Sequence, residues 1–150
     1  MTGEITLVRT IAASRDLVYQ AWTDPAELGW FFNPEFTSAV PIEVDLREGG
    51  SFVVEMIIND DFRYFTGGIY LELVPPERIV FAFGSTDGWP KLDPANLDDA
   101  PIVTITLADV DGSTLLTLAM TVPDRFADDF EPMQAGWGDT IDRVVAKFAS

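Results

Sequence analysis

The chain has 150 residues, the size of one domain, and can bury about 70% of the surface that its unfolded form exposes. It contains neither cysteine nor histidine, which excludes disulfides, thiolate nucleophiles and the commonest general base and transition-metal ligand. Its net charge of −16 opposes binding to nucleic acid or to an anionic membrane surface, and solubility is the simplest explanation of that charge.

The N-terminal sequence, MTGEITLVRT, lacks the basic and apolar regions of a signal peptide. The sequence also has no apolar run of the roughly 18–20 residues that are needed to span a bilayer. We therefore expect a single cytoplasmic domain over residues 1–150.

The first predicted elements are one strand and two short helices. Residues 5–11 are β-branched and apolar at alternate positions, which predicts a strand. Ser14 can cap a helix whose apolar stripe includes Val18 and Trp22. The sequence Asp24-Pro25-Ala26-Glu27 is typical of a capping box and predicts a second short helix, whose end carries Trp30 and Phe31.

Six further strands are predicted between residues 40 and 120. Four alternating runs cover residues 40–83, and in the third of them one face is assigned to Phe65, Gly67, Ile69, Leu71 and Leu73. Residues 84–101, rich in Gly, Pro and Asp, predict a long loop. The last two runs are joined by Asp111-Gly112, the strongest short signal for a hairpin.

A long amphipathic helix is predicted over residues 131–148, because its apolar residues recur at helical spacing. That stripe consists of Met133, Trp137, Thr140, Ile141, Val144, Val145 and Phe148. Gly136 and Gly138 flank Trp137, although glycine inside a helix costs about 1 kcal/mol relative to alanine. We interpret them as allowing close approach of helix to sheet; the alternative is that they leave volume for a ligand.

This order of elements predicts an α+β fold in which a curved antiparallel sheet wraps around the C-terminal helix and the two short helices close one end. Several motifs, in this order and spacing, also resemble one family along the whole chain. They are VYQAW at residues 18–22, TDPAEL at 23–28, Trp30-Phe31, DLREGG at 45–50, GIYLEL at 68–73, PPERIV at 75–80 and Gly136-Trp137.

The resemblance is to the activator of heat-shock-protein-90 ATPase homologues, within the START-like (SRPBCC) superfamily. It implies the helix-grip fold, with a cavity between the sheet and the C-terminal helix. Members of the superfamily bind apolar molecules such as lipids, sterols and polyketides, and some are cyclases. The loop at 84–101 is longer than usual for the family.

The candidate ligand-binding residues are the aromatic, methionine and isoleucine side chains expected on the inner face, because flat rings and flexible thioethers suit an apolar guest. They are Trp22, Trp30, Phe31, Phe52, Met56, Phe65, Phe81, Phe83, Met120, Met133, Trp137 and Ile141. By strand parity Arg63 points inward and could hold an acidic group at the rim. The alternative for each residue is that it fills the core.

Other motifs have simpler explanations. Arg47 with Gly49-Gly50 is explained by a turn rather than by an anion site, and the segment 109–112 has the wrong spacing for a calcium loop. No catalytic residues, metal or cofactor are predicted. The leading hypothesis is a non-enzymatic binder of a small hydrophobic molecule; the alternatives are a co-chaperone-like module that contacts a chaperone, and a cyclase-like enzyme.

Overall fold

The computed structural model describes residues 3–23, 42–59, 62–84, 93, 95–96 and 100–148; of residues 42–43, 54–59, 62–64, 125, 127, 129 and 147 it describes the backbone alone. The elements in chain order are β1 (Gly3–Ile11), α1 (Arg15–Thr23), β2 (Ile42–Val44), β3 (Ser51–Asn59), β4 (Phe62–Val74), β5 (Arg78–Phe83), β6 (Ile102–Val110), β7 (Ser113–Val122), the 3₁₀ segment η2 (Asp124–Asp129) and α3 (Phe130–Phe148). The predicted helix that starts at Asp24 lies outside the described residues, as do most of residues 84–101.

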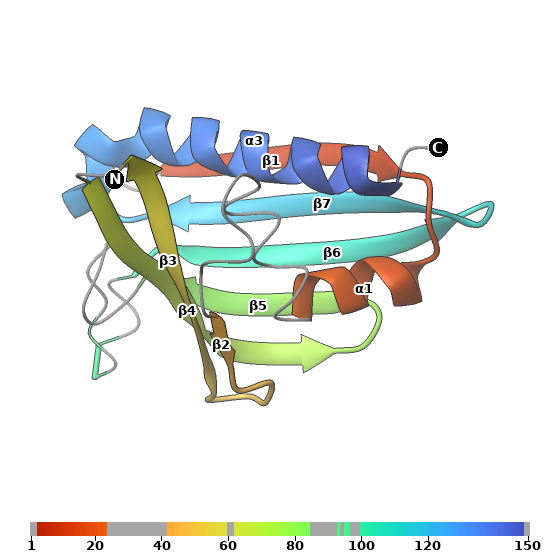
Figure 1. Ribbon diagram of the computed structural model, residues 1–150, viewed down its shortest axis with the longest axis horizontal. Helices are drawn as coiled ribbons and strands as arrows, with labels where there is room; N and C mark the ends of the chain where they lie inside the picture. The colour runs from red at the N-terminus through yellow and green to blue at the C-terminus, as the bar shows by residue number, and fades with distance from the viewer. Residues whose placement is uncertain are drawn as a thin grey trace.

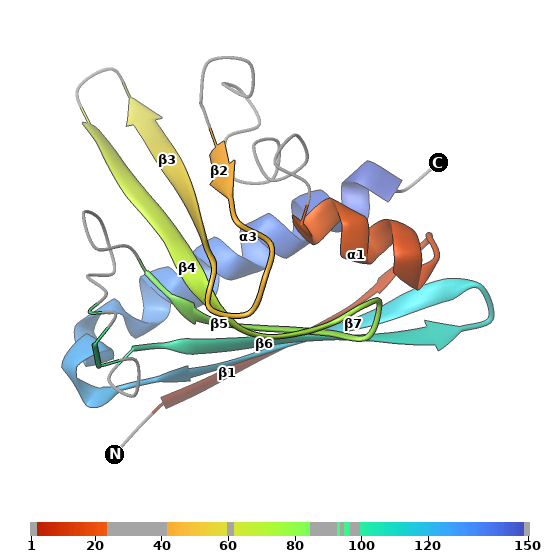
Figure 2. The ribbon, with the colours of Figure 1, turned by 90° about the horizontal axis from the view of Figure 1, so that it is seen from below.

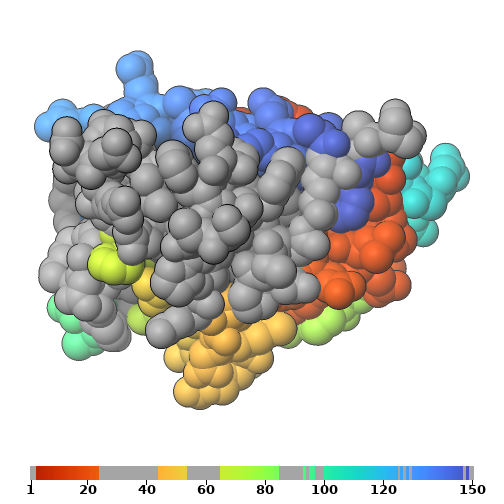
Figure 3. Space-filling view, viewed as in Figure 1, coloured from red at the N-terminus to blue at the C-terminus, as the bar shows by residue number. Residues whose placement is uncertain are grey.

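One antiparallel sheet of seven strands, in the order β1-β7-β6-β5-β4-β3-β2, forms the body of the protein. Helix α3 lies along one face of this sheet, and α1 lies beside the C-terminal half of α3 (Figures 1 and 3). Strands β3 and β4 rise from the floor made by β5, β6, β7 and β1, on the side where both helices lie (Figure 2). The predicted α+β helix-grip fold is confirmed.

The turn between β6 and β7 has the predicted chemistry. Asp111 and Gly112 both have positive φ, 54° and 87°, and Val110 pairs directly with Ser113. Such a two-residue turn matches the twist of the strands it joins, and glycine reaches this backbone region without a Cβ clash. The hairpin prediction at Asp111-Gly112 is therefore confirmed.

Strand β4 changes its inward-facing parity part-way along. Its pairing with β5 shifts register between Tyr70 and Glu72, which is the mark of a β-bulge. Before the bulge Tyr70 is buried, whereas Phe65 and Leu71 are exposed; after it, Leu73 packs against the core. The prediction of one inward face from Phe65 to Leu73 is wrong, because the extra residue of the bulge reverses the alternation.

The core is a single large cluster between the sheet and the two helices. Met133, Trp137, Thr140, Ile141 and Val144 of α3 are each at most 4% exposed, so the predicted apolar stripe is confirmed. Helix α3 contacts β1, the strand at the edge of the sheet. Full burial of a side chain such as that of Ile141 stabilises the fold by about 1.5–3 kcal/mol.

The glycines beside Trp137 do not lie at a close approach between helix and sheet. A Cβ built at Gly136 or at Gly138 has no described atom within 4 Å, and Gly136 is exposed to solvent. The interpretation that they make room for the sheet is therefore wrong. Gly136 also leaves no enclosed volume beside Trp137, since its open side faces solvent.

The substitution Gly136→Ala is expected to stabilise the protein by up to about 1 kcal/mol, because alanine loses less backbone entropy in a helix and its Cβ meets no described atom within 4 Å here. Thermal denaturation would show a rise of about 2–4 °C in Tm. A fall in Tm would mean that the exposed helix face contacts a part of the protein that needs the space.

No helix within the described ranges is long and apolar enough to cross a membrane.

Candidate functional site

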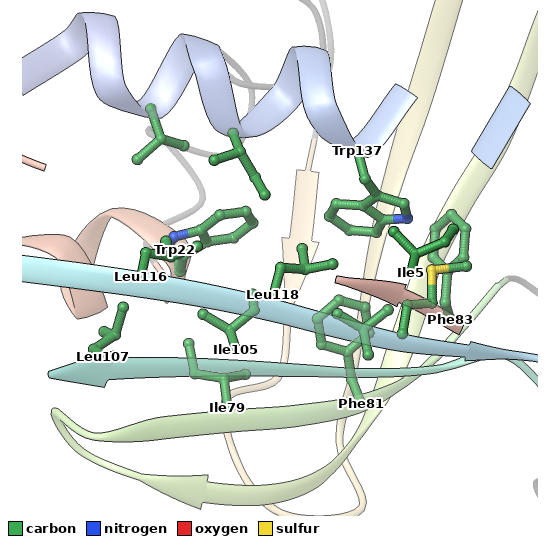
Figure 4. Packing of buried hydrophobic residues seen from close by; sticks show 14 of the residues in the cluster. Ile5, Trp22, Ile79, Phe81, Phe83, Ile105, Leu107, Leu116, Leu118 and Trp137 are labelled. Atoms are coloured by element: carbon green, nitrogen blue, oxygen red, sulfur yellow. The ribbon is translucent and has the colours of Figure 1, made fainter. Parts of the chain in front are cut away.

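Five aromatic side chains from four elements, α1, β3, β5 and α3, form a cluster that includes Trp137. The centroid of the Trp137 indole lies 5.1 Å from that of Phe83, 6.0 Å from that of Phe81 and 6.4 Å from that of Trp22 (Figure 4). Phe52 of β3 meets Phe81 edge to face at 5.1 Å, with an interplanar angle of 87°. Each such pair contributes about 0.5–1.5 kcal/mol beyond the area it buries.

A small cavity lies inside this aromatic cluster, with a volume of about 10 Å³. That volume has room for about one water molecule. Among the residues that the structure describes, its walls come from α1, α3 and strands β3 to β6 and are formed by Trp22, Phe52, Tyr70, Ile79, Phe81, Ile105 and Trp137.

Gly68 allows the rings of this wall to meet. A Cβ at Gly68 would lie 2.7 Å from Cδ2 of Phe81, closer than real Cβ contacts, and at a tight 3.0 Å from Cε1 of Phe52. The bare backbone of β4 at this position therefore lets Phe52 and Phe81 pack edge to face over it.

Tyr70 brings a hydroxyl group into the apolar site. The residue is 2% exposed, and its hydroxyl has no hydrogen-bond partner among the residues that the structure describes. Leaving such a group unpaired costs about 1–3 kcal/mol. Burial raises the pKa of Tyr70 above its ordinary value of 10.0, and the nearby Tyr19 raises it further. The Tyr70 hydroxyl therefore stays protonated at neutral pH and can donate a hydrogen bond.

The substitution Tyr70→Phe is expected to maintain or raise the free energy of unfolding at neutral pH. It should also reduce the loss of stability that the protein shows at alkaline pH. Above the ordinary pKa of 10.0 the unfolded tyrosine releases a proton that the folded one keeps, so stability falls as pH rises. For Tyr70 this loss is up to about 1.4 kcal/mol per pH unit. Urea denaturation from pH 8 to 11 measures this loss of stability. If the free energy of unfolding fell equally with pH in both proteins, the raised pKa of Tyr70 would be contradicted.

Comparison with known proteins places the chain in a family. A family model described as "Activator of Hsp90 ATPase homolog 1-like protein" matches residues 12–149. The chain belongs to this family. A comparison with curated proteins finds no match.

Solved structures with the same fold include proteins from Chromobacterium violaceum and Rhizobium loti. Protein CV1439 from Chromobacterium violaceum is 28% identical, with a TM-score of 0.74 and 97% of each chain covered. Mll3558 protein from Rhizobium loti is 21% identical, with a TM-score of 0.77, covering 97% of this chain and 96% of the other. DynU16, described as a protein in the dynemicin biosynthetic locus, is 21% identical with a TM-score of 0.70, over 95% of this chain and 46% of its own.

In this member of the Hsp90 ATPase activator-like family, some of the residues predicted to line a cavity do so and others do not. Trp22, Phe52, Phe81 and Trp137 line the cavity. Phe65 does not, since it lies on the outer face of β4 before the bulge and 42% of its surface is exposed. Buried in the same core, but outside the described lining, are Phe83, Met120, Met133 and Ile141.

Four predicted residues cannot be placed in the site. Met56 and Arg63 pair through their backbones with Tyr64 and Ile57, and their side chains lie outside the description. Trp30 and Phe31 lie outside the described residues altogether.

Sequence reasoning missed Tyr70, Ile79 and Ile105 as lining residues. Ile79 and Ile105 belong to correctly predicted inward-facing runs, so their alternation was a usable signal. Tyr70 alternates with the face predicted for Phe65 to Leu73, and no residue pattern marks the bulge that reverses this alternation.

The turns that contain charged residues have structural roles. Arg47 donates through Nε to Asp45 at 2.9 Å beside Gly49, whose φ is 87°, as expected for a turn. The Asp109 carboxylate accepts a hydrogen bond from the Gly112 amide within the β6–β7 turn. Among the residues that the structure describes, no acidic cluster could hold a metal ion.

Proposed function

We propose that this protein binds a small, mainly apolar molecule between α3 and strands β3 to β6. The observation that carries the proposal is a small aromatic cavity lined by Tyr70, whose buried hydroxyl has no partner among the described residues. A core that served packing alone would gain stability by having phenylalanine at position 70.

A ligand larger than water requires the aromatic side chains to move apart. Each ring contact that opens costs about 0.5–1.5 kcal/mol. A ligand that buries about 200 Å² of apolar surface gains roughly 5 kcal/mol, which offsets the separation of a few ring pairs. Trp22 and Trp137 lie on separate helices, so their rings can part without breaking the sheet.

Two similarities support this class of function. The superfamily that the chain resembles binds lipids, sterols and polyketides, and DynU16, which shares the fold, is described as part of the dynemicin biosynthetic locus. Both point to small organic molecules.

Ile105→Ala is the variant that tests whether the cavity receives ligand. Ile105 is a fully buried lining residue, and its truncation enlarges the cavity, so a small aromatic probe such as cumene needs less ring movement. The affinity of the Ile105→Ala variant for cumene, followed by tryptophan fluorescence, is expected to rise about fivefold, equivalent to about 1 kcal/mol. Native mass spectrometry of the unmodified protein with lipid extracts and a small-molecule library would search for the natural ligand.

The matched control is Leu116→Ala, because Leu116 is equally buried but lies outside the described lining. Both truncations should destabilise the protein by about 2–5 kcal/mol, and the control should leave probe affinity unchanged. Equal gains in the two variants, or no binding to either, would contradict the proposal.

A second candidate is contact with a chaperone, favoured by the family match over residues 12–149. A pull-down with a heat-shock-protein-90 homologue from the same cell, followed by an ATPase assay, tests it. Failure to recover the chaperone at micromolar concentrations would dispose of this candidate without affecting the first.

Catalysis by a cyclase-like mechanism has less support in the described site. Tyr70 is the ionisable residue of the described lining, and its raised pKa suits hydrogen-bond donation rather than removal of a proton from a substrate.

A further inference from the structure

The polar side chains among the described lining residues share one property, which is that they can donate hydrogen bonds. In the described lining the polar side-chain atoms are the Tyr70 hydroxyl and the indole nitrogens of Trp22 and Trp137. An indole N–H donates only, and a phenol donates readily. The lining contains no carboxylate, amide or imidazole that could accept a hydrogen bond from a ligand within the described residues.

The described part of this wall offers no positive charge. None of the described lining residues is Lys or Arg, and the chain as a whole carries a net charge of −16. An isolated carboxylate or phosphate that entered such a site would lose its hydration without gaining a counterion, which costs far more than a hydrogen bond returns.

A second buried hydroxyl on β4, that of Thr66, lies away from the Tyr70 hydroxyl. Thr66 is 3% exposed and its hydroxyl also has no hydrogen-bond partner among the described residues. It lies four residues before Tyr70, which along an extended strand is about 13 Å. One small polar group cannot contact both hydroxyls, so Tyr70 supplies the cavity's only hydroxyl among the described lining residues.

We propose that the ligand is an uncharged, mainly apolar molecule with a hydrogen-bond acceptor, such as a ketone or ester carbonyl, which accepts the Tyr70 hydroxyl proton. This inference rests on the proposed function and specifies its ligand class. The hydroxyl already buried beside the cavity then gains a partner on binding, whereas a pure hydrocarbon leaves it unpaired and a carboxylate adds an unpaired charge.

Three probes of nearly equal shape separate these cases: acetophenone, cumene and benzoate. They present a carbonyl oxygen, a methyl group and a charged carboxylate at the same position on the same ring. Calorimetric titration of the unmodified protein and of Tyr70→Phe measures each affinity. Tyr70→Phe is expected to lower the affinity for acetophenone about three- to tenfold, which is the factor that one neutral hydrogen bond supplies. The affinity for cumene should not change. Benzoate should bind at least about tenfold more weakly than acetophenone.

Tyr19→Phe is the matched control, since Tyr19 is a buried tyrosine of α1 that is not part of the described lining. It should not change the affinity for any probe, and thermal denaturation should show both variants folded. An equal effect of Tyr19→Phe on acetophenone would overturn the role of Tyr70.

The remaining outcomes separate this inference from the proposed function. If acetophenone and cumene both bind and Tyr70→Phe changes neither, the hydrogen-bond donor is overturned while the apolar site stands. If benzoate binds most tightly, the uncharged ligand class is overturned. If none of the probes binds, the apolar site itself is overturned, and this inference with it.

Discussion

Replacing Trp137 with alanine is expected to lower the free energy of unfolding by about 3–5 kcal/mol. The indole is 3% exposed, and its ring contacts Trp22, Phe81 and Phe83, which belong to α1 and β5. Its removal leaves a void where helix α3, helix α1 and the sheet meet, and the rings around it cannot all collapse inward. Urea denaturation followed by far-UV circular dichroism measures the loss.

Gly136→Ala, one residue earlier in the same helix, is the control for Trp137→Ala because it changes an open position. The two variants should shift stability in opposite directions. If Trp137→Ala costs less than about 1 kcal/mol, the indole is not the centre of the packing between helices and sheet. The void left by the indole also predicts that folded Trp137→Ala binds cumene more tightly than the unmodified protein does.

Replacing Gly67 with alanine is expected to destabilise the protein by at least about 3 kcal/mol or to prevent folding. A Cβ at this position would lie 2.0 Å from the carbonyl oxygen of Phe52, a backbone atom that cannot move without breaking the pairing of Val53 with Gly67. Gly67 also has φ of +155°, which side-chain-bearing residues rarely adopt. Thermal unfolding and the yield of soluble protein both report the effect.

Gly49→Ala is the matched control for Gly67→Ala. Gly49 also has a positive φ, +87°, but a Cβ there would have no described atom within 4 Å. Its cost should therefore be limited to backbone strain of about 1–2 kcal/mol. Similar losses in both variants would show that the clash with the Phe52 carbonyl is relieved by a shift of β3.

The regular elements were predictable because their periodicity records which face is buried. The stripe through Trp137 on α3 and the Asp111-Gly112 turn each follow from a local rule that the surrounding fold does not override. The order of these elements also predicts that a curved sheet wraps around the last helix, and the resemblance to a known family implies the same arrangement.

The candidate site was predictable only where it lies on regular elements. Trp22, Phe52, Phe81 and Trp137 occupy positions whose burial follows from helical or strand spacing. Tyr70 depends on the bulge beside it, and a bulge is a tertiary fit between two strands that leaves no periodic trace. The size of the cavity depends on sub-ångström packing of rings from several elements, which composition does not record.

The glycines inside α3 show a second limit of prediction from residue spacing. A glycine beside a buried tryptophan suggests crowding, yet Gly136 faces open solvent. Residue spacing assigns positions to faces of a helix, but it does not say why a residue with low helix propensity was retained there.

The pairing of β1 with β7 has a consequence for the synthesis of this protein. Gly3 pairs with Val122 and Ile11 with Thr114, so the first strand made has to wait for one of the last. At a translation rate of about 5–20 residues per second, that wait is roughly 5–20 s. During it the apolar face of β1 has neither its neighbouring strand nor α3, which follows β7 in the chain. The nascent chain is therefore expected to be most vulnerable to aggregation just before its two ends meet, and contacts of such long range also slow folding.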